Sequence, residues 1–560
     1  MPALITLENF ALSVGSTQLL DGVSASVVEG QRIAVVGPNG CGKSTLLRAL
    51  SGSSEDYYVV GAGSVASRGA VLLVEQDALQ WSRLLPLAEC DEAGLREMTL
   101  PDALDMAAAA SGDEGAMEDV EAWRRLSIAA QEALDWKTAT YDATPLGRLS
   151  PGSATRAYLA VALRRRDVKL LLLDEPTNYL DIPSMLWLQE TILASGKAVV
   201  VVSHDEAFLD AVADHVWDVD PDKRSLSVSG ARYSAYCRAK ALAREQQRVA
   251  YDAQQERHKR LTTVANKLRQ ASAKGERHAG TDHDLLQRDF RRNRAGRSGR
   301  KAKAIESLRD SEPRVERVVD RAPLRIDLDA PQVGGDSSII LGSVVIGYDG
   351  EPLPFLKKPI TLRVDFGERV AIVGYNGVGK SSLLRSLTGA IEPCGGDVHV
   401  GRELRVGNLT QEHETLPRNE TPREHLSAKT GMSLFDARAR LIRYGLTRQQ
   451  VDRPIGQLNP GARARALLAS FAIRKVNALV LDEPSNHLDD EAVAEVIATL
   501  NEYEGTVIVV SHSRDFLESL QLTRILRLGS DGLTEIESVD AFVRVTEEAV
   551  RAVVTESFRS

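Results

Sequence analysis

The feature of this sequence that most constrains its fold is that its motifs occur twice. The segment GPNGCGKST (Gly37 to Thr45) recurs as GYNGVGKSS (Gly374 to Ser382). The segment LLLDEPTNYLD (Leu171 to Asp181) recurs as LVLDEPSNHLD (Leu479 to Asp489), and VVVSHDEAFL later recurs as VVSHSRDFL. Self-similarity of this kind marks a duplicated structural unit. We therefore predict two copies of one domain.

The intervals within the two copies agree closely. Asp174 to His204 and Asp482 to His512 are both 30 residues apart. One interval differs, because the first copy holds about 26 extra residues in an acidic, alanine-rich stretch at about 85–125, whose composition favours helix. With 560 residues the chain is long enough to build two large cores.

Local patterns predict the secondary structure around the motifs. QRIAVVG and ERVAIVG are short β-branched runs that end at a glycine, and the helix formers STLLRAL and SSLLRSL follow. This order indicates a strand, a phosphate loop and a helix. KLLLLDE and ALVLDE are nearly continuous apolar runs, as expected of parallel strands buried on both faces. The predicted fold class is α/β, with two such domains in tandem.

Both glycine-rich segments fit the phosphate-loop pattern G-x-x-x-x-G-K-[ST]. The glycines let backbone N–H groups converge on phosphate oxygens, and the start of the helix adds positive potential. The lysines would reach the β- and γ-phosphates, and the serines that follow them would bind Mg²⁺. The predicted ATP-binding residues are Gly37, Pro38, Asn39, Gly40, Cys41, Gly42, Lys43, Ser44 and Thr45 in the first copy, and Gly374, Tyr375, Asn376, Gly377, Val378, Gly379, Lys380, Ser381 and Ser382 in the second.

An acid pair ends an apolar strand in each copy, and a histidine follows a later strand. The aspartates would bind Mg²⁺ through its water shell, and the adjacent glutamates would polarise the attacking water. The histidines would contact the γ-phosphate region. The candidates are Asp174 and Asp482 for the metal, and Glu175, Glu483, His204 and His512 for catalysis.

Together these motifs resemble those of a known protein family. The phosphate loops, the LDEP motifs, the NYLD and NHLD turns and the two histidines are similar to those of ATP-binding cassette (ABC) domains, and two such domains with a basic linker resemble the ABC-F subfamily. The resemblance implies paired α/β domains that sandwich two ATP head to tail. It implies association with ribosomes, where the linker approaches the peptidyl-transferase centre and transfer RNA. It also implies that Gln76 and Gln411 are Mg²⁺ ligands and that Tyr348 stacks on adenine.

The sequence departs from the family at its signature segment and at one adenine position. The family pattern LSGGQ, which closes over the ATP of the opposite domain, is LSPGS and LNPGA here. Its second glycine remains as Gly152 and Gly461, while Ser150 and Asn459 are predicted helix N-caps that could also face phosphate. A proline is tolerated in the first turn of a helix, so we expect closure on ATP to persist, with a lowered hydrolysis rate. Val14 takes the place of the adenine-stacking aromatic in the first copy.

The stretch between the copies is strongly basic. From Arg238 to Ala322 there are 23 Lys or Arg and 12 Asp or Glu, in a chain of net charge −9. Its first part lacks glycine and proline and predicts a helix of about 35 residues, about 50 Å long. An approximate a/d stripe would pair with a returning helix. The stripe is Leu242, Val249, Ala253, Leu261, Val264 and Leu268, opposite Ile305 and Leu308.

The basic linker predicts contact with a polyanion. Arginine suits phosphate and base stacking, so ribosomal RNA or transfer RNA is the expected partner. We expect no DNA partner and a monomer whose two domains pair with each other. The predicted RNA contacts lie at the linker tip and are Arg291, Arg292, Arg294, Arg297 and Arg300.

The sequence predicts a cytoplasmic ATPase with ATP and Mg²⁺ as ligands. No apolar run approaches the roughly 18 residues of a membrane helix, no secretion signal is apparent, and four scattered cysteines suit a reducing compartment. The expected domains are 1–235, a linker at 236–325, and 326–560. The function would be translation or antibiotic-resistance ribosome protection. The alternatives are the ATP-binding subunit of an ABC transporter, a repair or chromosome ATPase, and a nucleotide-locked binding protein.

Overall fold

The computed structural model describes residues 3–38, 40–52, 58–60, 64–67, 70–75, 81–84, 91–111, 144–149, 151–165, 167–178, 180–277, 297, 300–315, 335–348, 350–353, 356–409, 417–486, 488 and 490–559. The chain divides into two compact units. One combines Met1–Tyr233 with Pro323–Ser560, and the other is Ser234–Ala322. The domain boundaries at 235 and 325 stay a prediction.

The first copy is built on a six-stranded sheet in the order β10-β9-β3-β8-β7-β6, in which only β10 runs antiparallel to its neighbour. Its strands are β3 (Arg32–Val36), β6 (Ala70–Val74), β7 (Val168–Asp174), β8 (Ala198–Val202), β9 (His215–Asp220) and β10 (Ser225–Ser229). An antiparallel sheet shares a core with it and contains β1 (Ala3–Val14), β2 (Thr17–Val28), β4 (Tyr58–Val60) and β5 (Ser64–Ser67).

The second copy repeats this topology. Its six-stranded sheet has the order β17-β18-β19-β15-β20-β21, and only β21 is antiparallel. These strands are β15 (Arg369–Val373), β17 (Val406–Leu409), β18 (Ala478–Asp482), β19 (Thr506–Val510), β20 (Arg524–Gly529) and β21 (Gly532–Ile536). Its antiparallel strands are β11 (Ile339–Val345), β14 (Ile360–Val364) and β16 (Gly395–Val400), with a hairpin of β12 (Gly347–Tyr348) and β13 (Glu351–Pro352). The six-stranded sheets correspond strand for strand, so the duplication predicted from the motifs is confirmed.

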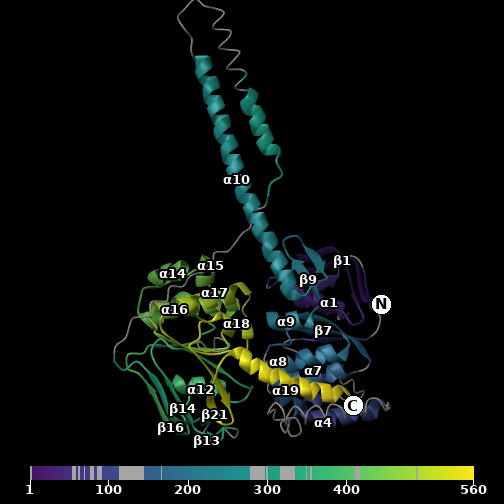
Figure 1. Cartoon of the computed structure of the whole chain (residues 1–560), viewed down its shortest axis with the longest axis vertical. Coiled ribbons are helices and arrows are strands. Elements are labelled where there is room, and N and C mark those ends of the chain that lie inside the picture. Colours follow the sequence, from purple (N-terminus) through teal and green to yellow (C-terminus); the bar gives the residue numbers. More distant parts are fainter. Residues whose placement is uncertain are drawn as a thin grey trace, which may run out of the picture. The chain divides into compact units, whose positions relative to one another are not determined.

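Four helices also correspond between the copies (Figure 1). In the first copy they are α1 (Lys43–Leu50), α7 (Pro151–Arg164), α8 (Ile182–Ser195) and α9 (Glu206–Val212). In the second they are α12 (Lys380–Leu387), α16 (Pro460–Ile473), α17 (Asp490–Glu502) and α18 (Arg514–Ser519). The other helices in the described ranges of this unit are α2 (Trp81–Leu84), α3 (Glu92–Glu97), α4 (Leu100–Ser111), η1 (Leu146–Arg148), α13 (Pro422–Thr430), α14 (Leu434–Arg443), α15 (Arg448–Val451), η2 (Ile455–Gln457) and α19 (Val539–Arg559).

The predicted helical insertion of the first copy is described only in part. Helices α3 and α4 fall within the stretch at about 85–125, and residues 112–143 lie outside the described ranges. The two apolar strands predicted as buried on both faces are β7 and β18: Leu170 to Asp174 of β7 and every residue of β18 are buried, and only Lys169 near the start of β7 is exposed. Buried central strands hold their carboxyl ends rigidly, and these ends carry the acid pairs.

The two copies share apolar packing. Ile182, at the start of α8 in the first copy, belongs to the hydrophobic core of the second copy, and Met185 and Leu186 pack against that core. Helix α19 of the second copy packs along α8, where Arg551 bonds Glu190 at 3.1 Å. The seam between the copies is therefore part of one folded unit.

The linker unit contains α10 (Tyr233–Arg277), a helix of 45 residues and about 65 Å, and a returning helical segment at 300–311. This confirms the predicted helical hairpin. The predicted stripe is wrong in detail, since Leu242, Val249, Val264 and Leu308 are exposed. The buried contacts come from Gln254, Ala265 and Ala302 instead. Small and polar residues can form the contact between two helices, so the apolar pattern alone did not predict which residues of the linker hairpin are buried.

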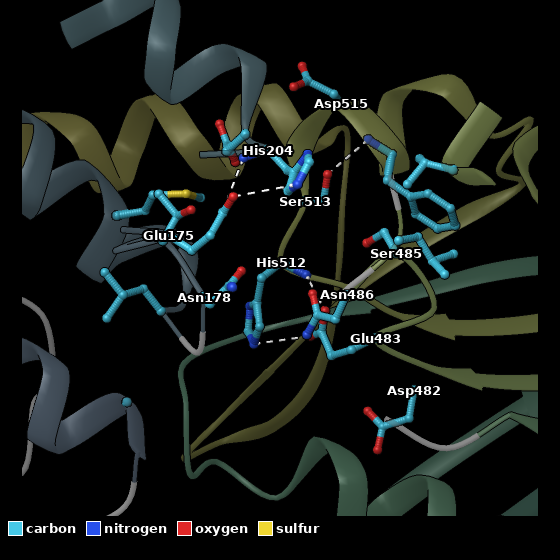
Figure 2. Close-up of a pocket in the computed structure, with 18 of the residues that line it drawn as sticks. Glu175, Asn178, His204, Asp482, Glu483, Ser485, Asn486, His512, Ser513 and Asp515 are labelled. Carbon is cyan, nitrogen blue, oxygen red and sulfur yellow. Dashed lines mark hydrogen bonds and ion pairs between the residues drawn. The ribbon is translucent and has the colours of Figure 1, made fainter. Parts of the chain in front are cut away.

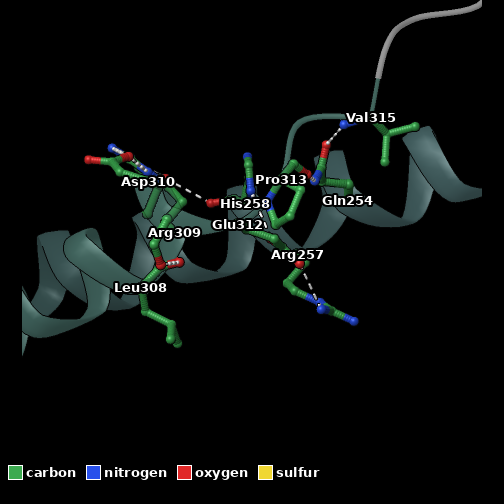
Figure 3. A network of polar contacts seen from close by, with 11 residues as sticks. Gln254, Arg257, His258, Leu308, Arg309, Asp310, Glu312, Pro313 and Val315 are labelled. Carbon is green, nitrogen blue, oxygen red and sulfur yellow. Dashed lines mark hydrogen bonds and ion pairs between the residues drawn. The ribbon is translucent and has the colours of Figure 1, made fainter.

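Polar contacts fasten the linker hairpin near its base (Figure 3). The Gln254 amide donates to the carbonyl oxygen of Pro313 (2.7 Å) and accepts from the N–H of Val315 (3.0 Å). Glu312 lies 2.9 Å from both Arg257 and His258 on α10. A buried amide that satisfies two backbone groups fixes how α10 and the returning segment are aligned with each other.

None of the helices in the described ranges is long and apolar enough to cross a membrane.

Candidate functional site

A cavity of about 1340 Å³ is lined by both copies (Figure 2). It collects most of the predicted site residues. From the first copy these are Gly40, Gly42, Lys43, Ser44, Thr45, Gly152, Asp174, Glu175 and His204. From the second they are Tyr348, Asn376, Gly377, Gly379, Lys380, Ser381, Ser382, Asp482, Glu483 and His512.

The phosphate loops are backbone structures that only glycine can form. Gly37 and Gly374 have φ of 150° and 153°, and a Cβ on Gly374 would lie 2.5 Å from the carbonyl oxygen of Leu528. The lysine ammonium lies over each loop. Lys43 Nζ donates to the carbonyl oxygen of Gly37 (2.8 Å), and Lys380 Nζ donates to that of Gly374 (2.9 Å). A charged donor is thus held against the phosphate loop in each copy.

The two candidate catalytic glutamates have an unusual backbone conformation. Glu175 and Glu483 have φ of 49° and 51°, in the left-handed region, which costs about 1 kcal/mol or more for a residue with a Cβ. The N–H of each donates to the end of the neighbouring strand, at Val202 O and Val510 O respectively, both at 2.9 Å. This bond turns the side chain out of the sheet edge and toward the cavity.

Each glutamate contacts the histidine of its own copy. In the second copy Glu483 Oε2 accepts from the N–H of His512 (3.1 Å) and Oε1 lies 3.2 Å from Nε2. In the first copy the matching distances between Glu175 and His204 are 3.3 Å and 3.5 Å. His204 is also the more exposed side chain, at 32% against 17% for His512. The two sites therefore have the same design, with the first held more loosely.

Burial shapes the electrostatics of these pairs. Desolvation raises the pKa of Glu175 and raises that of Glu483 to about 8. Desolvation, with the nearby charge of Lys380, lowers the pKa of His512 to about 3. Near neutral pH the second pair is thus a neutral imidazole beside a carboxyl group that titrates in the working range, as suits a proton acceptor.

The predicted metal ligands are hard oxygen donors in adjacent positions. Ser44 Oγ donates to Asp174 Oδ1 at 3.0 Å. Burial raises the pKa of Asp174 and of Asp482, and Oδ1 of Asp482 is buried with no hydrogen-bond partner among the described residues. Mg²⁺ prefers oxygen ligands and usually needs only one or two carboxylates besides substrate phosphates. A serine hydroxyl beside a buried aspartate, as at Ser44 and Asp174, is a donor set that fits Mg²⁺ held together with phosphates.

The predicted adenine positions hold different residue types in the two copies. Tyr348 lies on β12, lines the cavity, is 46% exposed, and bonds Ser382 Oγ through its hydroxyl at 2.7 Å. Val14 lines the same cavity from the first copy. An exposed aromatic face beside one phosphate loop, with only a valine at the other, gives the second site the larger stacking surface.

The signature segments are placed unequally. Gly152 lines the cavity from the first turn of α7. In the second copy Asn459 is the N-cap of α16, as predicted, with its side chain accepting from the N–H of Ala462 at 2.9 Å. Asn459 and Gly461 are not among the residues lining the cavity in the described part of the chain, so their contact with ATP stays a prediction.

Several predicted residues are not placed at this cavity. Asn39, Gln76, Ser150, Gln411, Arg291, Arg292 and Arg294 lie outside the described residues. The loop residues Gly37, Pro38, Cys41, Gly374, Tyr375 and Val378 are described but are not among those that line the cavity. Arg297 and Arg300 are exposed residues of the linker.

Sequence reasoning missed a residue that joins the copies. Asp181, which ends the NYLD turn and caps α8, is fully buried, and its Oδ2 accepts from the N–H of Asn376 in the second phosphate loop at 2.6 Å. Burial pushes its pKa up, but Arg156, His512 and its hydrogen bonds outweigh burial and lower the pKa overall. The repetition of this aspartate as Asp489 was the available signal, although Asp489 is outside the described residues.

Comparisons with known proteins agree with this geometry. The family described as ABC transporter matches residues 20–178 and 357–486. The ribosome protection protein VmlR of Bacillus subtilis (strain 168) is 28% identical over 94% of this chain and 87% of its own length. ATP-binding cassette sub-family F member 3 of Homo sapiens is 30% identical over 99% of this chain and 74% of its own length. A solved structure of the archaeal ribosome recycling factor aABCE1 with the ribosomal stalk protein aP1 has the same fold, with a TM-score of 0.55 at 18% identity over 97% of this chain and 92% of that one.

Proposed function

The chain belongs to the F subfamily of the ATP-binding cassette proteins, and from this we propose that it is an ATPase whose nucleotide-dependent domain closure acts on the ribosome. The observation that carries the proposal is the single cavity that brings both phosphate loops, both acid pairs and both histidines together. Each element corresponds to a step of ATP binding or hydrolysis, and both copies contribute to the same space.

The residues of the second copy illustrate the chemistry. The loop N–H groups and Lys380 would bind the phosphates of ATP. Ser381 and Asp482 would hold Mg²⁺, which neutralises phosphate charge when bound. Glu483 would take the proton of the attacking water, with His512 fixing its orientation through the two contacts described above. The first copy would use Lys43, Ser44, Asp174, Glu175 and His204 in the same roles.

Closure would follow from contacts that only the paired copies can make. Asp181 of the first copy holds the second phosphate loop through Asn376, and Gly152 of the first copy lines the same cavity. Because these groups lie across the seam from Lys380, ATP bound at the second loop would touch both copies. Its binding would favour the closed state by the difference in affinity between the two states.

The ribosome is the proposed partner on two grounds. The relatives include a ribosome protection protein, and the linker unit carries a local excess of positive charge with exposed Arg297 and Arg300. Ribosomal RNA and transfer RNA are the polyanions that such a linker would bind. The long helical hairpin favours this role over that of a transporter's ATP-binding subunit.

Co-sedimentation with ribosomes tests the proposal. Glu175→Gln/Glu483→Gln should bind ATP without turnover and pellet with ribosomes, whereas Lys43→Ala/Lys380→Ala should stay in the supernatant. Charge reversal at Arg297 and Arg300 should lower the fraction of protein that pellets with ribosomes. It should also make that fraction less sensitive to salt concentration.

A matched charge reversal at Arg244 and Arg248, which lie on α10 of the same linker unit but away from its tip, serves as the control for net charge. ATP-independent pelleting of all variants would contradict the proposal, as would binding to membranes in place of ribosomes. Growth in the presence of antibiotics would then separate ribosome protection from a general role in translation.

A further inference from the structure

Helices α9 and α18 occupy the same place in the two copies. Each begins two residues after the histidine of its own site. Each also has its own N-cap, because Asp205 accepts from the N–H of Phe208 (2.6 Å) and Ser513 accepts from the N–H of Phe516 (3.3 Å). An N-cap satisfies only one of the four unpaired N–H groups at the start of a helix.

Helix α9 receives a second cap from the other copy. Asp515 Oδ2, in the first turn of α18, accepts from the N–H of Ala207, in the first turn of α9, at 3.3 Å. Ala207 and Asp515 are the same position of the repeated segments SHDEAFL and SHSRDFL. In a two-fold arrangement, equivalent positions that contact each other lie beside the axis. This contact therefore sits at the centre of the seam.

The contact works in one direction only. Perfect two-fold symmetry would pair it with a cap from position 207 onto α18. Alanine has a methyl group there and cannot accept a hydrogen bond. The second copy thus caps the helix that follows the first histidine, while Ala207 at the matching position of the first copy cannot return the bond.

The recipient site is the one that needs the support. His204, two residues before α9, is more exposed than His512 and lies farther from its glutamate. The bond from Ala207 to Asp515 also lies among several acidic side chains. Asp205 lies beside Asp515 and Glu206, and its pKa is raised to about 6, first by burial and then by the nearby Asp515, while Arg514 acts in the opposite sense. Figure 2 shows Asp515 above the cavity, close to the loop that carries His204.

We propose that Asp515 is a positioning residue of the first nucleotide site, which holds the start of α9, and through it His204, from the opposite copy. His204 would then depend on the opposite copy for one bond that adds to its own contacts with Glu175 and the Asp205 cap. The start of α18 lacks the equivalent bond, because the matching residue of the first copy is Ala207. The two ATP sites would differ in their dependence on closure. The inference rests on the proposed ATPase function.

The test compares Asp515→Ala with Asp515→Asn in the full-length chain. Loss of one capping bond corresponds to about a fivefold effect, so Asp515→Ala should lower kcat about fivefold with KM within twofold. Asparagine keeps an oxygen acceptor and should restore kcat. The drop should be larger in a Glu483→Gln background, where the first site alone turns over, than in a Glu175→Gln background. Glu518→Ala, an exposed position on the same helix, should behave as wild type.

Hydrogen exchange of the Ala207 amide supplies a readout that does not depend on turnover. Asp515→Ala should speed this exchange about fivefold, and Asp515→Asn should not. Unchanged exchange in Asp515→Ala would overturn the inference even if the chain hydrolysed no ATP, an outcome that would separately refute the proposed function. Equal drops in both single-site backgrounds, or an Asn variant as slow as the Ala variant, would also overturn it.

Discussion

Replacing Asp181 separates stability within the first copy from closure between the copies. Its carboxylate makes two kinds of contact: it caps α8 by accepting from the N–H of Ser184 (3.0 Å), and it accepts from the N–H of Asn376 across the seam (2.6 Å). Alanine removes both contacts. Asparagine is as good an N-cap as aspartate and keeps an acceptor oxygen, but loses the charge.

The magnitudes follow from these two contacts. Loss of the cap should destabilise α8 by about 1 kcal/mol. Loss of the hydrogen bond to a charged acceptor should weaken closure by about 1.5–3 kcal/mol, which is about 10- to 150-fold. Since a charge-assisted bond is roughly twice as strong as a neutral one, asparagine should cost about half of that free energy, or about 3- to 12-fold.

Steady-state ATP hydrolysis measures the effect. We expect kcat/KM to fall about 10- to 150-fold in Asp181→Ala and about 3- to 12-fold in Asp181→Asn, with circular dichroism confirming that both variants are folded. A folded Asp181→Ala variant with kcat/KM within twofold of wild type would refute the claim that this contact stabilises the closed state. Equal losses in both variants would assign the whole effect to charge.

Three further predictions concern other parts of the molecule. Tyr348→Ala should weaken binding of a fluorescent ATP analogue at the second site about 3- to 10-fold by removing the stacking face, and Tyr348→Phe should bind within twofold of wild type. Because the raised pKa of Glu483 is about 8 and the proton acceptor must be ionised, kcat/KM should rise with pH and level off above about pH 8. Gln254→Leu should speed hydrogen exchange of the Val315 amide about 5- to 100-fold, since it leaves that N–H and the carbonyl of Pro313 without their partner.

Each of these outcomes has a clear opposite. Equal affinity in Tyr348→Ala and wild type would remove the tyrosine from the nucleotide site. A pH profile that is flat from pH 6 to 9 would show that Glu483 is not the group that titrates. Unchanged exchange at Val315 would mean that the hairpin base is held by the Glu312 contacts alone.

The elements that depend on local sequence were predictable. The strand, loop and helix around Lys43 and Lys380 follow from glycine spacing and apolar runs, and the cap at Asn459 follows from its place before a proline at the start of a helix. These features depend on backbone geometry within a few residues, which the sequence records directly. Each pattern is common by itself, and its occurrence twice at matching spacing made the fold assignment specific.

The features that depend on packing between distant segments were not predictable. The buried residues of the linker hairpin include Gln254 and Ala265, because a small residue and a hydrogen-bonded amide fit a contact between two helices better than Val249 and Val264 do. The contact of Asp515 with Ala207 departs from the repeat, so comparing the copies gave no signal for it. Such contacts become visible only when both copies are placed in space.

The central claim is that the paired copies together enclose ATP, and the most direct test is the number of ATP molecules that one chain retains. In Glu175→Gln/Glu483→Gln, rapid gel filtration after incubation with labelled ATP and Mg²⁺ should recover two slowly exchanging ATP per chain, and adding Asp181→Ala should speed release from the second site. Rapid loss of both nucleotides, or release that ignores Asp181→Ala, would contradict the account.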